Sequence, residues 1–199
     1  MPLLPMPPIA ETAAADLLRF NRQVLDQALQ VITAHEGPQA PTYVGPVGSH
    51  LRHVIEHFEA LLLGAEHTAV DYDQRPRDRL LERCTVEARR RVLALQAQLA
   101  PGRPLPLERP LTVRGQAGLA GELGFAVAST IGRELVFVAS HAVHHYALLQ
   151  SHCRQQGLDL GADFGKAPAT VAHERGGAIT PSSTLLQKDT PCTPTRLAA

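Results

Sequence analysis

The chain has 199 residues, in which 19 lysines and arginines balance 19 aspartates and glutamates, and 44% of the residues are hydrophobic. This length and composition favour one globular domain with a sizeable core. The zero net charge provides no overall positive field, so we expect no nucleic-acid partner. No apolar stretch reaches the ~20 residues that span a bilayer, and no basic segment precedes an apolar run at the start. We therefore expect no membrane partner and no secretory signal.

Apolar residues at helical spacing predict four helices. Their expected bounds are about 11–36, 47–63, 79–99 and 131–156. Gly64 and Gly157 are expected to end the second and the fourth helix, and Thr130 is the expected N-cap of the fourth. These signals predict helices long enough to form the sides of a bundle.

The region from 101 to 130 contains too many prolines and glycines for a helix. Two short β-like runs within it, PLTVRG and LGFAVAS, predict a small hairpin or another extended excursion. Residues 158–174 are expected to be ordered but irregular, and residues 176–199, rich in Ser, Thr and Pro, are expected to form a disordered tail. The predicted fold class is therefore all-α: a four-helix bundle over residues 1–175, with a long crossover between its third and fourth helices.

The three cysteines, Cys84, Cys153 and Cys192, form no CxxC pair. An odd number of cysteines without such spacing favours reduced thiols, which are typical of the cytoplasm. The sequence therefore predicts a cytoplasmic protein.

Six of the ten histidines fall into two short clusters on the second and fourth predicted helices. They are His50, His53 and His57 in the first cluster, and His141, His144 and His145 in the second. At ~100° per residue, His141 and His145 lie ~40° apart on one helix face, and His144 lies ~60° to the other side of His141. His53 and His57 form a second pair at i, i+4. Such a pair presents two imidazoles, one turn apart, to a single metal ion.

A single HxxxH pair is common in helices, and packing or surface exposure explains most of them. Two clusters on two apolar helices are harder to explain, because burying several imidazoles without partners is costly. We therefore hypothesise a metal site in which three histidines leave positions open for catalysis. Glu134 lies within ~20° of the face of His141. It is expected either to hydrogen-bond a ligand or accept a proton, or to be an acid that is favoured by the helix dipole or forms an ion pair with Arg133.

The two histidine clusters resemble elements of the DinB-like (DinB/YfiT-type) superfamily. The segment SHAVHHYALLQ is similar to the HxxxH element on the last helix of that superfamily, and PVGSHLRHVIEHFEALL is similar to its second-helix element. The resemblance covers residues 10–175 and implies that His53, His141 and His145 hold a divalent metal ion. A shift of the alignment by one helical turn makes His57 or His50 the alternate ligand.

The resemblance implies that His144 points aside from the metal ion. Many relatives follow the last histidine with Arg-Gly-Gln, whereas this chain has Tyr146-Ala147-Leu148, so no particular substrate is implied. Imidazole ligands suit Zn²⁺, Ni²⁺ and Fe²⁺ alike, and ligand type does not select among them.

The function that the resemblance implies is a metal-dependent hydrolase or a thiol S-transferase. The open metal position takes water in the first case and a low-molecular-weight thiol in the second. The expected partners are therefore a small-molecule substrate or such a thiol, and a second copy of the chain in a homodimer. The alternative is a non-catalytic bundle that serves in a stress response or as a dimerising module.

Overall fold

The structure is a computed structural model that describes residues 11–103 and 105–176. The chain divides into two compact units, Met1–Ala167 and Pro168–Ala199. The first unit contains α1 (Glu11–Ala34), α2 (Pro46–His67), β1 (Ala69–Asp71), α3 (Thr85–Gln98), β2 (Pro110–Ala117), β3 (Leu123–Thr130) and α4 (Ile131–Gln155). The second unit contains α5 (Pro168–Glu174).

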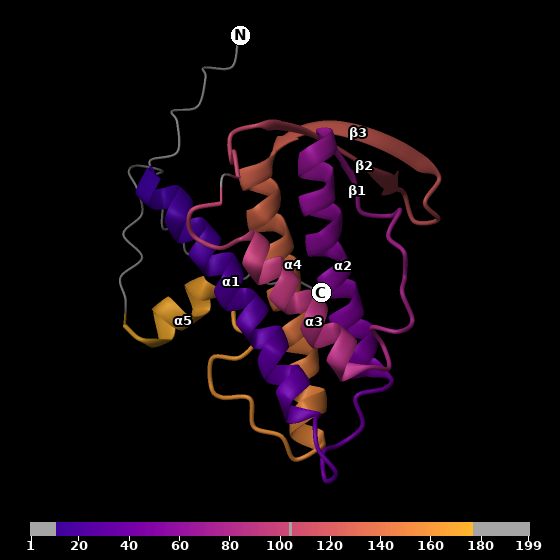
Figure 1. The fold of residues 1–199 in the computed structure, drawn as a ribbon, viewed down its shortest axis with the longest axis vertical. Coiled ribbons are helices and arrows are strands. Elements are labelled where there is room, and N and C mark those ends of the chain that lie inside the picture. Colours follow the sequence, from indigo (N-terminus) through magenta and orange to yellow (C-terminus); the bar gives the residue numbers. More distant parts are fainter. Residues whose placement is uncertain (1–10, 104, 177–199) are drawn as a thin grey trace, which may run out of the picture. The chain divides into compact units, whose positions relative to one another are not determined.

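Helices α1 to α4 pack side by side in the first unit (Figure 1). Helix α2 contacts both α3 and α4, and α1 contacts α3 and α4. Pro46 occupies the first turn of α2, where its missing N–H has no helical partner to lose. Thr130 caps α4 as expected, since its hydroxyl accepts a hydrogen bond from the Arg133 backbone N–H at 3.2 Å. The packing of α2 against α4 brings the two histidine clusters onto facing helices.

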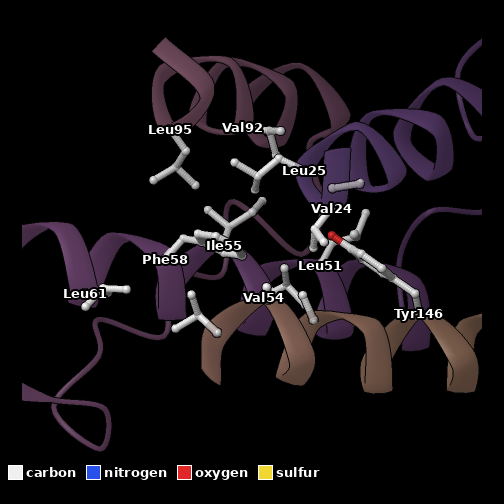
Figure 2. Close-up of a cluster of buried hydrophobic side chains, with 14 of the residues drawn as sticks. Val24, Leu25, Leu51, Val54, Ile55, Phe58, Leu61, Val92, Leu95 and Tyr146 are labelled. Atoms are coloured by element: carbon white, nitrogen blue, oxygen red, sulfur yellow. The ribbon is translucent and has the colours of Figure 1, made fainter. Parts of the chain in front are cut away.

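The core lies between the apolar faces of these helices (Figure 2). Leu25 of α1, Ile55 and Phe58 of α2, and Leu95 of α3 are at most 1% exposed. Tyr146 of α4, the residue directly after the last clustered histidine, is also fully buried. Because α2 and α4 are held together by this core, the histidines at their margin occupy fixed positions.

The all-α prediction is wrong, because the first unit contains a three-stranded mixed sheet in the order β1-β2-β3. The two runs expected to form an extended excursion are the antiparallel strands β2 and β3, in which Val113 lies opposite Val127. Strand β1 pairs parallel to β2, with Val70 beside Val113. Its three residues carry too little alternation to be recognised in the sequence. The strand forms because the Val70 side chain is buried against Gly64 of α2 while its backbone pairs with β2.

The second helix extends one turn further than predicted, to His67. Gly64 lies inside it because a Cβ there would stand 2.7 Å from the carbonyl oxygen of Ala69, so the glycine permits the close approach of β1. The helix ends at Thr68, which adopts the left-handed conformation with φ 61°.

The third helix begins at Thr85 instead of residue 79. The preceding residues form turns, in which the Asp78 carboxylate accepts the Leu80 N–H at 2.9 Å and the Leu81 carbonyl accepts the Tyr43 hydroxyl at 2.9 Å. Competition from such side-chain hydrogen bonds favours turns over helix at this position.

Residues 168–174, expected to be irregular, form α5. The predicted disordered tail from residue 177 onward lies outside the described residues. Within 11–103 and 105–176, every helix is too short or too polar to cross a membrane. The cytoplasmic location stays a prediction.

Replacing Gly48 by alanine is expected to destabilise the first unit by about 1–3 kcal/mol, the usual cost of overpacking. A Cβ at this position would lie 2.1 Å from the carbonyl oxygen and 2.9 Å from the Cα of Glu82, so backbone must move. Denaturant unfolding checks the loss. Gly124→Ala is the matched control, because its Cβ would meet nothing within 4 Å. Equal stability of the two variants would contradict the close packing of α2 against the 79–84 turns.

Candidate metal centre

Three histidines of the two clusters converge at the margin of the α2–α4 interface. His53 comes from α2, and His141 and His145 come from α4; one nitrogen of each lies within 4.8 Å of the others. The Nε2 atom of His141 is 2.8 Å from Nε2 of His53 and 3.2 Å from Nε2 of His145. All three side chains are half-buried. His141 therefore provides the central nitrogen of the group.

The donor set fits a divalent transition metal. Two nitrogens bound to one ion in tetrahedral coordination lie about 3.3 Å apart, close to the two Nε2 separations in this group. Protons alone satisfy the three atoms only when both contacts share a single group of His141, either its one Nε2 lone pair or its one Nε2–H. An ion satisfies three lone pairs at once, so this arrangement is better matched to a metal than to protons.

The imidazoles of this cluster are held in the neutral form that binds metals. Burial, reinforced by neighbouring histidines, lowers the pKa of His53 to about 2 and that of His145 to about 4. Burial also lowers the pKa of His57 to about 3, and the pKa values of His50 and His141 lie below the ordinary value of 6.5. At neutral pH a lone pair is therefore available on each ring.

The two alternate ligands occupy different places. His50 contacts His145 at Nδ1, the ring nitrogen that does not face His141, and the two Nδ1 atoms are 2.7 Å apart. His57 is buried and donates from Nδ1 to the His53 carbonyl at 2.6 Å, which leaves its Nε2 to accept from Arg75 at 3.1 Å. Among the described residues, the group whose geometry could hold a metal ion contains neither of them. The remaining histidine of the cluster, His144, is exposed on α4.

Glu134 is buried at the start of α4, and its described hydrogen bonds lead away from the three converging histidines. Its carboxylate accepts the Tyr72 hydroxyl at 2.9 Å, the Ser129 hydroxyl at 2.6 Å and the Arg133 guanidinium at 2.7 Å. The link from Glu134 to the cluster runs through Tyr72, whose ring stacks on His57 with centroids 5.4 Å apart. Glu134 thereby joins the loop after β1, strand β3 and helix α4.

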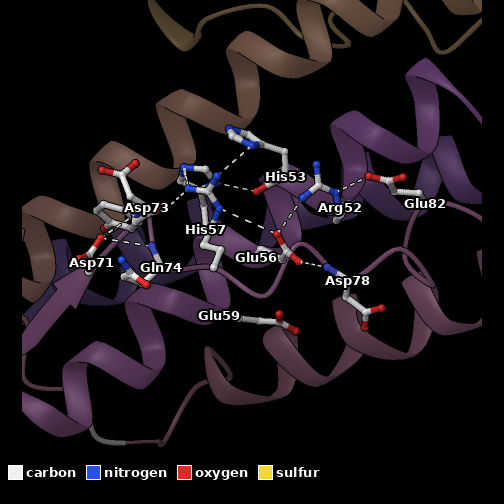
Figure 3. A network of polar contacts seen from close by, with 12 residues as sticks. Arg52, His53, Glu56, His57, Glu59, Asp71, Asp73, Gln74, Asp78 and Glu82 are labelled. Carbon is white, nitrogen blue, oxygen red and sulfur yellow. Dashed lines mark hydrogen bonds and ion pairs between the residues drawn. The ribbon is translucent and has the colours of Figure 1, made fainter. Parts of the chain in front are cut away.

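A charged network beside the histidines was not anticipated from the sequence. Arg75 reaches from the loop after β1 and places Nη2 3.4 Å from Nδ1 of His53. Its Nε lies 3.9 Å from Glu56, a fully buried carboxylate that also accepts the Asp78 N–H at 2.7 Å and pairs with Arg52 at 3.3 Å (Figure 3). The only sequence signal for Arg75 was its place in a polar connection, which does not indicate where a loop folds back.

Comparison with known proteins gives one partial match. A segment of 106 residues, 53% of this chain, is 30% identical to the protein named FK506-binding protein 5 from Rhizopus delemar. The chain covers 28% of the length of that relative, so the match does not establish a family. No protein-family model matches the sequence, and no solved structure matches it. The DinB-like resemblance rests on the two histidine elements and stays a prediction.

The metal-free protein is expected to lose stability as the pH falls from about 6.5 to 5. In this range the unfolded chain takes up protons on His53, His57 and His145, whereas the folded chain does not, because their folded pKa values are about 2, 3 and 4. Above pH 7 both states are neutral at these rings and the effect vanishes. Melting temperatures between pH 7.5 and 5 check this. His144→Ala should show the same decrease in melting temperature with falling pH as the wild type, and His53→Ala should show a smaller one. A wild-type melting temperature that does not change between pH 7.5 and 5 would contradict the prediction.

Proposed function

We propose that this chain is a DinB-like metal-binding protein whose site consists of His53, His141 and His145. The observation that supports the proposal is the convergence of their three Nε2 atoms from two facing helices. The ion is Zn²⁺, Ni²⁺ or Fe²⁺, all of which accept imidazole ligands. With three protein ligands, at least one position of the ion remains open.

The proposed activity is that of a metal-dependent hydrolase or a thiol S-transferase. A divalent ion supplies Lewis acidity, which lowers the pKa of the water or low-molecular-weight thiol that enters the open position. Phe137 lies beside the site, with its ring stacked on that of His141 at 5.7 Å between centroids. Arg75 places a positive charge beside His53, which favours an anionic group on the substrate or a thiolate.

Elemental analysis of protein purified without an affinity metal column tests this proposal. We expect about one equivalent of a transition metal in the wild type, loss of the metal in His53→Ala, and retention in His144→Ala. Protein that contains no metal and takes up none on dialysis against Zn²⁺, Ni²⁺ or Fe²⁺ would overturn the proposal. Hydrolase and thiol-transfer assays of the loaded protein, with and without added thiol, then separate the two reactions.

One observation supports a homodimer, which is expected for the enzyme and required by the alternative of a non-catalytic dimerising module. Strand β3 is at the edge of the sheet, carries no charged residue, and exposes Leu123, Phe125 and Val127 on one face. Uncharged edge strands are prone to pair with another strand, and two copies of β3 would meet without charge repulsion. Light scattering is expected to give a dimer mass for the wild type and a monomer mass for Phe125→Lys. A monomeric wild type would exclude this alternative.

A further inference from the structure

His50 lies one helical turn before His53 on α2 and faces the opposite side of His145 from the three converging Nε2 atoms. The two rings are 5.0 Å apart between centroids and tilted by 53°, and their Nδ1 atoms are 2.7 Å apart. This distance is at the short end of the range for hydrogen bonds between nitrogen atoms. One Nδ1 must therefore donate a proton and the other must accept it.

A metal ion on Nε2 of His145 decides which atom is the donor. A neutral imidazole has one N–H and one lone pair, so a ring that binds a metal through Nε2 carries its proton on Nδ1. His145 is then the donor, and Nδ1 of His50 is the acceptor with its own proton on Nε2. The bond thus links His145 to the preceding turn of the helix that supplies His53, and it fixes the tautomer and the ring orientation of His145.

We propose that His50 is a positioning residue of the metal centre: it orients His145 by accepting the Nδ1 proton and does not bind the ion. This inference rests on the proposed function, because it requires that Nε2 of His145 be a ligand. In metalloproteins the acceptor for a ligand histidine is usually a carboxylate, a backbone carbonyl or water, and such a bond raises the basicity of the ligand. In this chain an imidazole from the opposite helix takes that place.

Neither His57 nor Arg75 accepts a proton from a ligand histidine in the way that His50 does. His57 has both nitrogens engaged, with the His53 carbonyl and with Arg75, and its hydrogen bonds stay on α2 and the following loop. Arg75 approaches Nδ1 of His53 with a guanidinium N–H, which cannot accept a proton from a ligand imidazole. When His53 binds an ion through Nε2, its Nδ1–H would face this donor, so the guanidinium must turn away from His53 on metal binding. Among these contacts, the bond between His50 and His145 has the polarity that metal binding through Nε2 requires.

Substitution of His50 separates a positioning role from a ligand role. His50→Ala removes the acceptor, whereas His50→Asn retains one, because the Asn side-chain oxygen can occupy the place of histidine Nδ1. His144→Ala is the control, as it removes an exposed histidine from the same cluster. The measurements are Zn²⁺ affinity, from competition with a chromophoric chelator, and the absorption spectrum of the Co²⁺-loaded protein.

We expect His50→Ala to weaken Zn²⁺ binding about 10–100-fold, the usual effect of losing such a partner, and to shift the Co²⁺ spectrum. His50→Asn should restore most of the affinity and the wild-type spectrum, and His144→Ala should change neither. The melting temperature of the metal-free His50→Ala protein shows whether the variant is folded, which excludes unfolding as the cause of weaker Zn²⁺ binding.

Each other outcome overturns the positioning role. Unchanged affinity and spectrum in His50→Ala would show that the bond does not orient His145. Complete loss of binding, as in His53→Ala, would make His50 a ligand. If His50→Asn lost as much Zn²⁺ affinity as His50→Ala, the hydrogen-bond acceptor at this position would not be what supports metal binding. A wild-type protein that binds no metal would instead overturn the proposed function, and the inference with it.

Discussion

Replacing His141 by alanine is expected to abolish the stabilisation of the protein by Zn²⁺ or Ni²⁺. Its Nε2 is the atom that both other Nε2 atoms face, at 2.8 and 3.2 Å, so the substitution leaves His53 and His145 without the ligand between them. A ligand that binds only the folded state stabilises it by about 2.7 kcal/mol at a hundredfold excess over its Kd. The melting temperature of the wild type should therefore rise with added metal, and that of the variant should not.

His144→Ala is the matched control for this experiment, since it removes an exposed imidazole three residues further along α4. It should respond to the metal as the wild type does. The metal-free His141→Ala protein should melt at a temperature close to that of the metal-free wild type, because the lost side chain is half-buried and borders the cluster instead of the apolar core. A variant that is stabilised by metal to the same extent as the wild type would contradict the three-histidine site.

Replacing Glu56 by alanine is expected to lower the free energy of unfolding by about 3–5 kcal/mol, the usual cost of removing one partner from a buried ion pair. The Glu56 side chain is fully buried, and the side chains of Arg52 and Arg75 are 15% and 10% exposed. Without the carboxylate, the largely buried Arg75 loses its ion pair with Glu56, Arg52 keeps only its pair with Glu82 at 2.7 Å, and the Asp78 N–H loses its acceptor. Urea or guanidinium unfolding, with the slope compared between variants, measures the loss.

The control for this substitution is Glu36→Ala, which breaks the pair between Glu36 and Arg89. Both partners of that pair are 32% exposed, and the expected cost is below about 1 kcal/mol. Glu56→Gln keeps an acceptor for the Asp78 N–H and should fall between the two. If Glu56→Ala and Glu36→Ala lowered the free energy of unfolding by similar amounts, the buried network around Glu56 would not be what stabilises the loop that carries Arg75.

The helices were the most predictable part of the fold. Their apolar residues recur with the helical period, so α1, α2 and α4 appear close to their expected bounds, and the Thr130 cap is confirmed. The sheet was harder to predict from the sequence. Strand β1 is three residues long, and its pairing with β2 joins segments about forty residues apart, which no local pattern encodes. The class was therefore predicted as all-α, although the runs that became β2 and β3 had been recognised as extended.

By itself, the sequence determined which imidazoles share a helix face, because the angle between side chains on a helix depends only on their spacing. That spacing paired His141 with His145, whereas it was the DinB-like resemblance that implied that His144 points aside. Only the tertiary structure decided among His50, His53 and His57, which lie three or four residues apart on one helix and differ in what α4 and the 72–78 loop place against them. Long-range contacts depend on how helices and loops pack, and this packing assigns His53 to the converging group, His50 to the far nitrogen of His145, and His57 to Arg75.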